Sequence, residues 1–254
     1  MKFTKALVRR PCANVVHGLA TLHAEQPDFQ KALGQHDSYI DALKRCGLTV
    51  TVLPADEEFP DSTFVEDTAL LTPECAILMN PRAPSRNGEV VAIEQTLRQM
   101  YSRIERVSAP GTADAGDIMA VGTHYYIGLS TRTNNSGSAQ IIEILGRYGY
   151  TGSTIPLQHA LHLKSGVAYL ENNLLVVADE FRNNSAFTTF HCIEAPEQES
   201  FGANCVWING TVLLPTHCPE LKSQIVAHGL SVLELDVSEF QKLDGGLSCL
   251  SLRY

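Results

Sequence analysis

Apolar side chains recur every three or four positions in four stretches of the chain, a spacing typical of helices with one buried face. The first stretch begins after Pro27-Asp28, carries Phe29, Leu33, Ile40 and Leu43 on one stripe, and stops at Gly47. The pattern predicts three further helices, over residues 89–101, 136–148 and 219–228. Gly149 and Gly229 provide stop signals for the last two of them.

Short runs rich in β-branched and apolar residues follow each predicted helix, which is typical of strands. These runs cover residues 48–53, 104–107, 153–157 and 231–235. Further strands are expected at 76–79 and 174–177. Residues 206–208 and 212–214 flank Asn209-Gly210, the strongest short hairpin signal.

Each strand that follows a helix leads to a polar, turn-rich loop that ends in a charged or reactive side chain. The loops are FPDSTFVED, APGTADAGD, PLQHALHLKSG and KLDGGLSC. Asp67 and Asp114 are 47 residues apart, Asp114 and His162 48, and His162 and Cys249 87, about two further periods. A degenerate unit with Asn204 in its loop would fill the last gap. Recurrence at this period indicates a radially repeated architecture. Five units around an axis would bring an acid, a second acid, a histidine and a cysteine to one central site.

The length of 254 residues is compatible with one closed α/β domain over residues 1–254. The 28 acidic and 19 basic side chains leave a net charge of −9 without any basic stripe, which argues against a nucleic-acid partner. The longest apolar run, from Leu174 to Ala178, is far too short to cross a membrane, and no signal peptide is evident. We therefore expect a cytoplasmic protein with no membrane partner.

Seven cysteines, none closer than thirteen positions to another, exclude CxxC redox pairs and zinc-ribbon spacing. Free thiols in a reducing compartment are the simple interpretation for six of them. Cys249 follows the Gly245-Gly246 pair, which would let the backbone approach a ligand and expose the thiol. Cys249 taken alone is also compatible with a buried small apolar residue.

The loop histidines and acids also admit an ordinary structural interpretation. His159 and His162 could be structural side chains, and a zinc pair is not favoured because no further ligand lies at a plausible spacing. Asp61, Glu66 and Asp67 in one loop, and Asp114 and Asp117 in another, would usually be turn or cap residues. The unusual observation is that so many acidic residues occur in only two loops, which turn and cap roles alone do not explain.

Six segments resemble the dimethylarginine dimethylaminohydrolases, members of the guanidine-modifying superfamily. They are FPDSTFVEDTAL, APGTADAGDIM, YYIGLSTRTN, LHLKSGVAYLE, ANCVWIN and LDGGLSCLSLRY, in order along the chain. The resemblance begins at PCANVVHGL and extends to the last residue. It implies an α/β fold, a five-bladed pseudo-symmetric propeller of ββαβ units. Arginine deiminases carry an inserted helical domain, for which this chain has no room.

Under this resemblance, Cys249 matches the nucleophile, His162 the general acid/base and Asp114 the third member of the triad, where bacterial relatives often have Glu. Asp67 matches the carboxylate that grips the guanidinium, and Asp61 contacts the amino-acid end with Glu66 as a supporting acid. The remaining expected substrate contacts are the carboxylate-binding pair Arg86 and Arg132, with Arg82 as a rival for the first, and the backbone of Leu19 and Leu243 at the amino group.

The resemblance implies hydrolysis of Nω-methylated arginines to citrulline through a thiouronium on Cys249, without a metal or organic cofactor. A small-molecule substrate is the expected partner; a homodimer is allowed, although no strand edge or helix face is singled out for it. Three alternatives stay open: an arginine deiminase or other guanidine hydrolase on the same core, a non-catalytic propeller, and an arginine-binding module. Substrate preference depends on pocket volume, which sequence motifs do not report.

Overall fold

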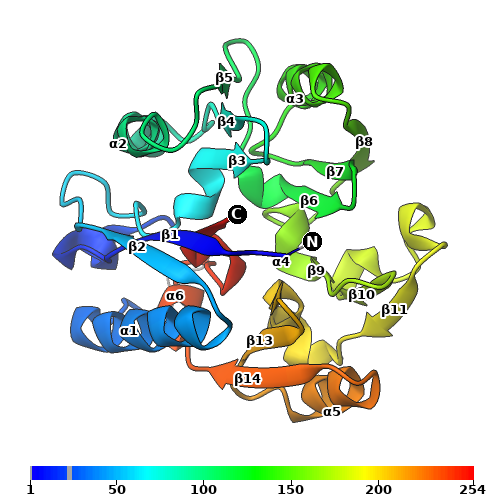
Figure 1. The fold of residues 1–254 in the computed structure, drawn as a ribbon. Helices are drawn as coiled ribbons and strands as arrows, with labels where there is room; N and C mark the ends of the chain where they lie inside the picture. The colour runs from blue at the N-terminus through cyan, green and yellow to red at the C-terminus, as the bar shows by residue number, and fades with distance from the viewer. Residues whose placement is uncertain (1, 22–24) are drawn as a thin grey trace.

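Five small sheets stand around a central axis in the computed structural model, which describes residues 2–21 and 25–254 (Figure 1). Within these residues every sheet has three strands. The helices α1, α2, α3 and α5 lie at the periphery of the ring, and the short α4 and α6 lie nearer its centre. The bounds of the six are Phe29–Arg45 (α1), Glu89–Leu97 (α2), Asn135–Arg147 (α3), Leu163–Gly166 (α4), Pro219–Ala227 (α5) and Ser238–Gln241 (α6). The five repeated units predicted from the loop spacing are confirmed.

Four sheets share one topology: an antiparallel hairpin, then a connection over the outside, then a third strand parallel to the second. A parallel neighbour requires such a crossover, and this explains why a helix precedes three of the third strands. The strands are β3 (Ala69–Leu71), β4 (Ala76–Leu78) and β5 (Ile104–Arg106); β6 (Ile118–Val121), β7 (His124–Leu129) and β8 (Thr151–Pro156); β9 (Val167–Tyr169), β10 (Leu174–Val177) and β11 (His191–Glu194); and β12 (Val206–Ile208), β13 (Thr211–Pro215) and β14 (Ser231–Leu235).

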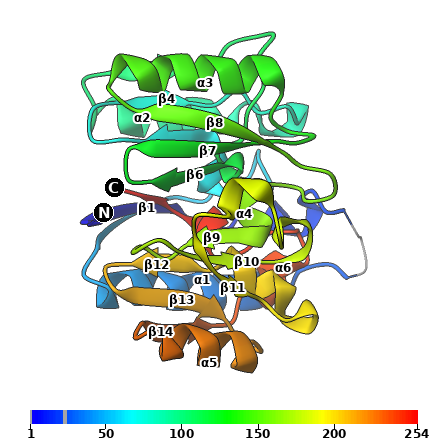
Figure 2. The ribbon, with the colours of Figure 1, turned by 90° about the vertical axis from the view of Figure 1, so that its right-hand side faces the viewer.

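The fifth sheet closes the ring with strands from both ends of the described chain. β1 (Lys5–Arg9) pairs in parallel with β2 (Thr49–Leu53) across α1, and antiparallel with β15 (Leu252–Arg253). β15 therefore occupies the place that the inner hairpin strand takes in the other four sheets. Figure 2 shows both chain ends at one end of the ring axis and α6 towards the other.

The predicted helices are confirmed, with shifted ends. α1 begins after Asp28, whose side chain caps the helix by accepting from the Lys31 N–H, and Gly47 follows with φ +87°. α2 ends at Leu97, four residues earlier than predicted. Met100 and Tyr101 nevertheless pack against the same core cluster as the helix, which explains why their spacing continued the helical pattern.

The degenerate fourth unit lacks a crossover helix. Short 3-10 helices, among them η5 (Asp179–Phe181) and η6 (Ser185–Phe187), connect β10 to β11 instead. The hairpin at Asn209-Gly210 is confirmed, with φ +50° and +95° at the two turn residues. The remaining 3-10 helices are η1 (Ala13–His17), η2 (Val65–Thr68), η3 (Pro84–Arg86), η4 (Ala115–Asp117), η7 (Glu197–Asn204) and η8 (Ser248–Leu250).

The core is divided into five apolar clusters, and most of them join side chains of neighbouring sheets. In one of them, Ile77 of β4 packs with Ile127 of β7 and Ile141 of α3. No helix in the described ranges is long and apolar enough to cross a membrane. The polar segments η2, η4, α4 and η8 are left to meet near the axis of the ring, where they contact one another.

Candidate active site

Loop ends from different units line one pocket of about 150 Å³. Its walls bring together most of the side chains expected to act on a substrate. Among the described residues they include Cys249, His162, Asp67, Asp61, Arg86, Arg132, Leu19 and Leu243. Residues 22–24, next to Leu19 and Thr21, lie outside the described part of the chain.

Cys249 lies in η8, and its position depends on the two glycines before it. A Cβ at Gly245 would lie 2.2 Å from the Phe64 ring, and one at Gly246 would lie 2.3 Å from Asn204 Oδ1. The glycines therefore allow close packing against protein side chains, not only against a ligand. Cys249 is 9% exposed, so the expectation that the glycine pair leaves the thiol exposed is wrong. Asn204 Nδ2 lies 4.0 Å from Cys249 Sγ.

His162 stands between two acids. Its Nε2 lies 3.2 Å from Asp114 Oδ2 and 4.0 Å from Asp67 Oδ1, so the shorter aspartate reaches the imidazole. Burial alone would lower the pKa of His162, but Asp67, Asp114 and Asp117 outweigh it and raise that pKa to about 9. The three acids around the imidazole therefore favour its protonated form.

Asp67 is ionised for the complementary reason. Burial opposes its charge, yet His162 and Arg86 hold the pKa of Asp67 below its usual value, at about 2. Arg86 Nη1 donates to Asp67 Oδ2 at 2.6 Å, and the Gly116 N–H donates to Asp67 Oδ1 at 3.0 Å. The pocket thus presents a fixed carboxylate, as needed to orient a guanidinium.

The thiol is neutral in the same environment. Burial, together with the carboxylates of Glu66 and Asp67, raises the pKa of Cys249 to about 12. A cation placed beside Asp67 would reverse the electrostatic part of this shift. A positively charged ligand in this pocket would therefore favour the thiolate form of Cys249.

The three arginines expected near a substrate carboxylate have different surroundings. Arg132 lines the pocket, and its guanidinium has no hydrogen-bond or ion-pair partner in the described part of the chain. Arg82 is exposed, does not line the pocket and donates to the Thr131 carbonyl at 3.0 Å. Arg132 is thus the arginine best placed to receive an anionic group.

Arg86 lines the pocket but is already fully engaged. Besides Asp67, its guanidinium donates to both carboxylate oxygens of Glu89 and to the carbonyl of Phe64. The side chain is 6% exposed. In this arrangement the Arg86 guanidinium holds Asp67. It is not the unengaged guanidinium that the sequence led us to expect as a ligand of the substrate carboxylate.

Asp61, Leu19 and Leu243, which we expected at the amino-acid end of the substrate, line one pocket. Asp61 Oδ1 accepts from the Leu19 N–H at 2.9 Å. Burial raises the pKa of Asp61, although Arg86 partly offsets this effect. The second oxygen of Asp61 has no hydrogen-bond donor among the described residues.

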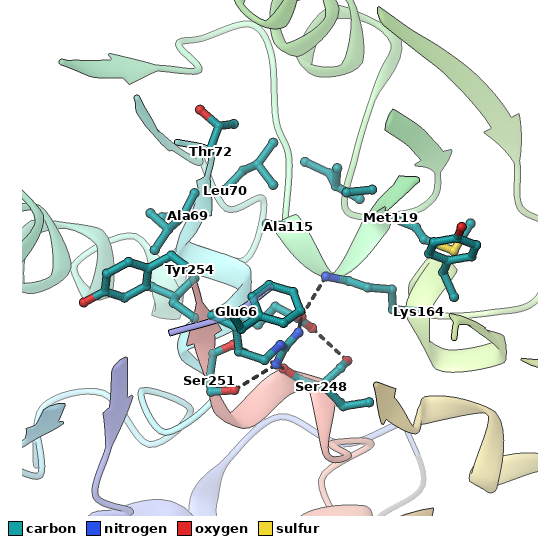
Figure 3. A pocket seen from close by; sticks show the side chains of 18 of the residues that line it. Glu66, Ala69, Leu70, Thr72, Ala115, Met119, Lys164, Ser248, Ser251 and Tyr254 are labelled. Carbon is teal, nitrogen blue, oxygen red and sulfur yellow. Dashed lines mark hydrogen bonds and ion pairs between the residues drawn. The ribbon is translucent and has the colours of Figure 1, made fainter. Parts of the chain in front are cut away.

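Glu66 does not line this pocket, so its expected substrate contact is not supported. It faces a separate cavity, where its carboxylate accepts from Lys164 at 2.7 Å, Arg253 at 2.9 Å and Ser248 at 2.9 Å (Figure 3). Consecutive residues of the short helix η2 point to different sides, and Asp67 alone of the pair reaches the pocket.

Asp117 has a role that sequence reasoning did not assign. Its Oδ2 accepts from the hydroxyls of Ser130 and Thr133, both at 2.6 Å, and its Oδ1 accepts from the Leu163 N–H at 2.9 Å. Thr133 Oγ1 in turn accepts from the Asp114 N–H, and Ser130 Oγ accepts from the Arg132 N–H. One buried carboxylate thus supports the loops that carry three site residues; the cluster DAGD was the available signal.

Asp67, Asp114 and His162 each offer a ligand atom, and these atoms lie within 4.8 Å of one another. The carboxylate oxygens of Asp67 already accept hydrogen bonds from Arg86 and from the Gly116 N–H, and a metal ion would have to compete with both donors.

Comparison with known proteins agrees with this geometry. The family model for eukaryotic N,N dimethylarginine dimethylhydrolase matches residues 20–197. The chain is 49% identical to the N(G),N(G)-dimethylarginine dimethylaminohydrolase of Pseudomonas aeruginosa, over 99% of this chain and 100% of that protein. It is 34% identical to the enzyme of that name from Streptomyces coelicolor, over 100% and 98% of the two chains.

Solved structures show the same relationship. The C249S mutant of DDAH from Pseudomonas aeruginosa, complexed with citrulline, superposes with a TM-score of 0.99 at 48% identity and full coverage of both chains. The N-terminal domain of ArgZ, a cyanobacterial arginine dihydrolase, matches with a TM-score of 0.90 at 19% identity, over 100% and 97% of the two chains, which shows the shared fold alone. The chain belongs to the dimethylarginine dimethylaminohydrolase family.

Proposed function

We propose that this protein hydrolyses asymmetric dimethylarginine and monomethylarginine to citrulline, with release of dimethylamine or methylamine. The observation that carries the proposal is the pocket itself: a thiol, a protonated imidazole and a fixed carboxylate lie at one site, with the unpaired Arg132 also lining it. The whole ring acts as one catalytic domain, because the lining residues come from several units.

Binding activates the nucleophile. Asp67 orients the substrate guanidinium by charge-assisted hydrogen bonds, and Arg132 receives the α-carboxylate. The cation offsets the negative charge around Cys249, and the thiol then loses its proton to solvent. The empty enzyme avoids a standing thiolate, because the carboxylates of Glu66 and Asp67 disfavour it.

The reaction then proceeds in two displacements. The thiolate attacks the guanidinium carbon, and His162 donates its proton to the departing amine as the C–N bond breaks. The resulting thiouronium is bonded to Cys249. Neutral His162 next takes a proton from water, the hydroxide attacks the same carbon, and the C–S bond breaks to release citrulline and the thiolate.

Replacement of the nucleophile tests this scheme. Cys249→Ala should lower citrulline formation by about 10³-fold or more, as expected when a catalytic unit loses its nucleophile. Mass spectrometry of the wild type under turnover should detect a covalent adduct that the variant lacks. Turnover by Cys249→Ala within tenfold of the wild type would refute the mechanism.

The substrate panel tests the preference. Dimethylamine release from asymmetric dimethylarginine is compared with ammonia release from unmethylated arginine, at matched concentrations. A higher kcat/KM for the methylated substrate supports the proposed function, and the reverse order would make the protein an arginine deiminase.

A cytoplasmic location forms part of the proposal. All seven cysteines are free in the structure, as expected for a reducing compartment. Association into a homodimer stays a prediction.

A further inference from the structure

A second cavity, of about 690 Å³, lies on the axis of the ring. The inner strand of every sheet contributes to its wall: β1 with β15, β3, β6, β9 and β12. It shares no lining residue with the pocket that contains Cys249. We call it the rear cavity. Its volume lies within the range of small-molecule sites in proteins, which is roughly 300–1,000 Å³.

The charged side chains that line the rear cavity are mostly basic, whereas the protein as a whole is acidic. Four cationic side chains, Lys2, Lys5, Lys164 and Arg253, line it together with two acidic side chains, Glu66 and Glu171, in a chain with a net charge of −9. Side chains of this sign around one cavity attract anions.

Two cations at its base share a single carboxylate. Lys164 and Arg253 both donate to Oε1 of Glu66, at 2.7 and 2.9 Å, and Figure 3 shows Lys164, Glu66, Ser248 and Ser251 gathered there. The base therefore carries one uncompensated positive charge. Lys164 has three N–H donors and one ion-pair partner in the described structure, and its side chain is 18% exposed.

The walls of the rear cavity also carry an apolar portion. Leu70, Met119 and the aromatic rings of Trp207 and Tyr254 line them. Burying an apolar body against these side chains is favourable, because apolar area is removed from water. A monoanion with an apolar body would satisfy both the base and the walls.

The rear cavity and the pocket are separated by three short segments that face both. Glu66, Ser248 and Lys164 line the rear cavity, whereas their neighbours Asp67, Cys249 and His162 line the pocket. Ser248 is held on both sides: its hydroxyl donates to Glu66, and its carbonyl accepts from Arg253. A ligand that competes for Lys164 or Arg253 would act on segments that carry the catalytic groups.

We propose that the rear cavity is a second ligand site, for a small carboxylic acid with an apolar body, and that its occupation slows the reaction at Cys249. The ligand carboxylate binds Lys164 and adds negative charge behind the thiol. Formation of the thiolate then becomes less favourable, because like charges repel. The inhibitory part rests on the proposed function; the binding part does not.

Trp207 allows occupation to be measured without any turnover, because it is the only tryptophan in the chain and lines the rear cavity. Its fluorescence is titrated with octanoate, and with octanol as the uncharged control of equal length. We expect a saturable change with octanoate and an at least tenfold weaker response to octanol. An absent or equal response would overturn the second site.

Variants locate the binding. Lys164→Gln should weaken octanoate binding at least tenfold, and Lys5→Gln, whose exposed side chain lies over the Tyr254 ring, severalfold. Lys222→Gln, which removes an exposed lysine paired with Glu234 outside the cavity, should leave it unchanged. Arg132→Ala should also leave it unchanged; loss of the signal there would place octanoate in the substrate pocket and refute the proposal.

The coupling is measured by the rate at which iodoacetamide alkylates Cys249, followed by mass spectrometry of the peptide that contains it. Saturating octanoate should slow alkylation at least threefold in the wild type and leave the rate in Lys164→Gln unchanged. Binding without any change in the alkylation rate would overturn the coupling. Failure of dimethylarginine turnover alone would touch the proposed function and leave the fluorescence result intact.

Discussion

His162 Nε2 lies 3.2 Å from Asp114 Oδ2, while Asp114 Oδ1 has no hydrogen-bond partner in the described chain. The contact shows that an aspartate reaches the imidazole from this loop. It also contributes to the raised pKa of His162, after the larger effect of Asp67.

Asp114→Asn should therefore change both the rate and its pH dependence. His162 donates a proton only below its pKa, so the alkaline limit of kcat/KM reflects a pKa raised to about 9. Removing the charge lowers that pKa, and the limit moves to lower pH, while kcat falls by about 10²-fold or more. A pH profile from 6 to 10 measures both. Asp114→Glu keeps the charge and should keep the limit; an unmoved limit in Asp114→Asn would contradict this role.

Asp117→Asn tests a positioning role. Three donors, from Ser130, Thr133 and Leu163, converge on the two oxygens of this carboxylate. Asparagine replaces one oxygen by an NH2 group, which donates and cannot accept, so at least one of the three hydrogen bonds is lost. We expect kcat to fall at least tenfold, since misplaced catalytic groups are costly. The pKa of His162, followed by NMR of the ring, should also fall, because Asp117 helps to raise it. A loss of stability with an unchanged His162 pKa would reduce Asp117 to a structural residue.

Arg132 and Arg82 are separated by a pair of matched substitutions. Arg132→Ala should raise KM for asymmetric dimethylarginine at least tenfold with a smaller change in kcat, because it removes binding to the substrate carboxylate. Arg82→Ala should alter KM less than twofold, since Arg82 is exposed and lies outside the pocket. Equal effects of the two substitutions would show that the exposed arginine moves to the substrate.

Arg86 is distinguished from both by a substrate that has a methylated guanidinium and no α-carboxylate. With this substrate the defect of Arg132→Ala should disappear, whereas that of Arg86→Ala should persist, because Arg86 holds Asp67. Arg86→Ala should also lower the free energy of unfolding by about 3–5 kcal/mol, as expected when one partner of a buried ion pair is removed. Disappearance of the Arg86→Ala defect would restore its expected role at the substrate carboxylate.

Much of the fold could be predicted because local signals agreed with the ring. The stripe from Phe29 to Leu43 and the Asn209-Gly210 turn each specify one element by short-range physics. The end of α2 could not be predicted in this way. Met100 and Tyr101 are partly buried by tertiary packing beyond the helix, and burial alone does not reveal backbone conformation.

The site residues, too, could be predicted only in part from the sequence. Residue types and loop spacing brought Cys249, His162 and Asp67 together, since only chemistry and period were needed. The side to which Glu66 points depends on one backbone step in a 3-10 helix, and the partners of Arg86 depend on Glu89 three residues later. Composition and periodicity predict neither the side that Glu66 faces nor the partners of Arg86.

The pairing of β15 with β1 has a consequence for the order in which the ring and the site can be assembled. β1 is translated before β15, the strand that completes its sheet, and the loop with Cys249 directly precedes β15. A nascent chain that ends before residue 249 has the acids and the imidazole but no nucleophile. The segment that closes the ring is therefore also the segment that supplies the thiol.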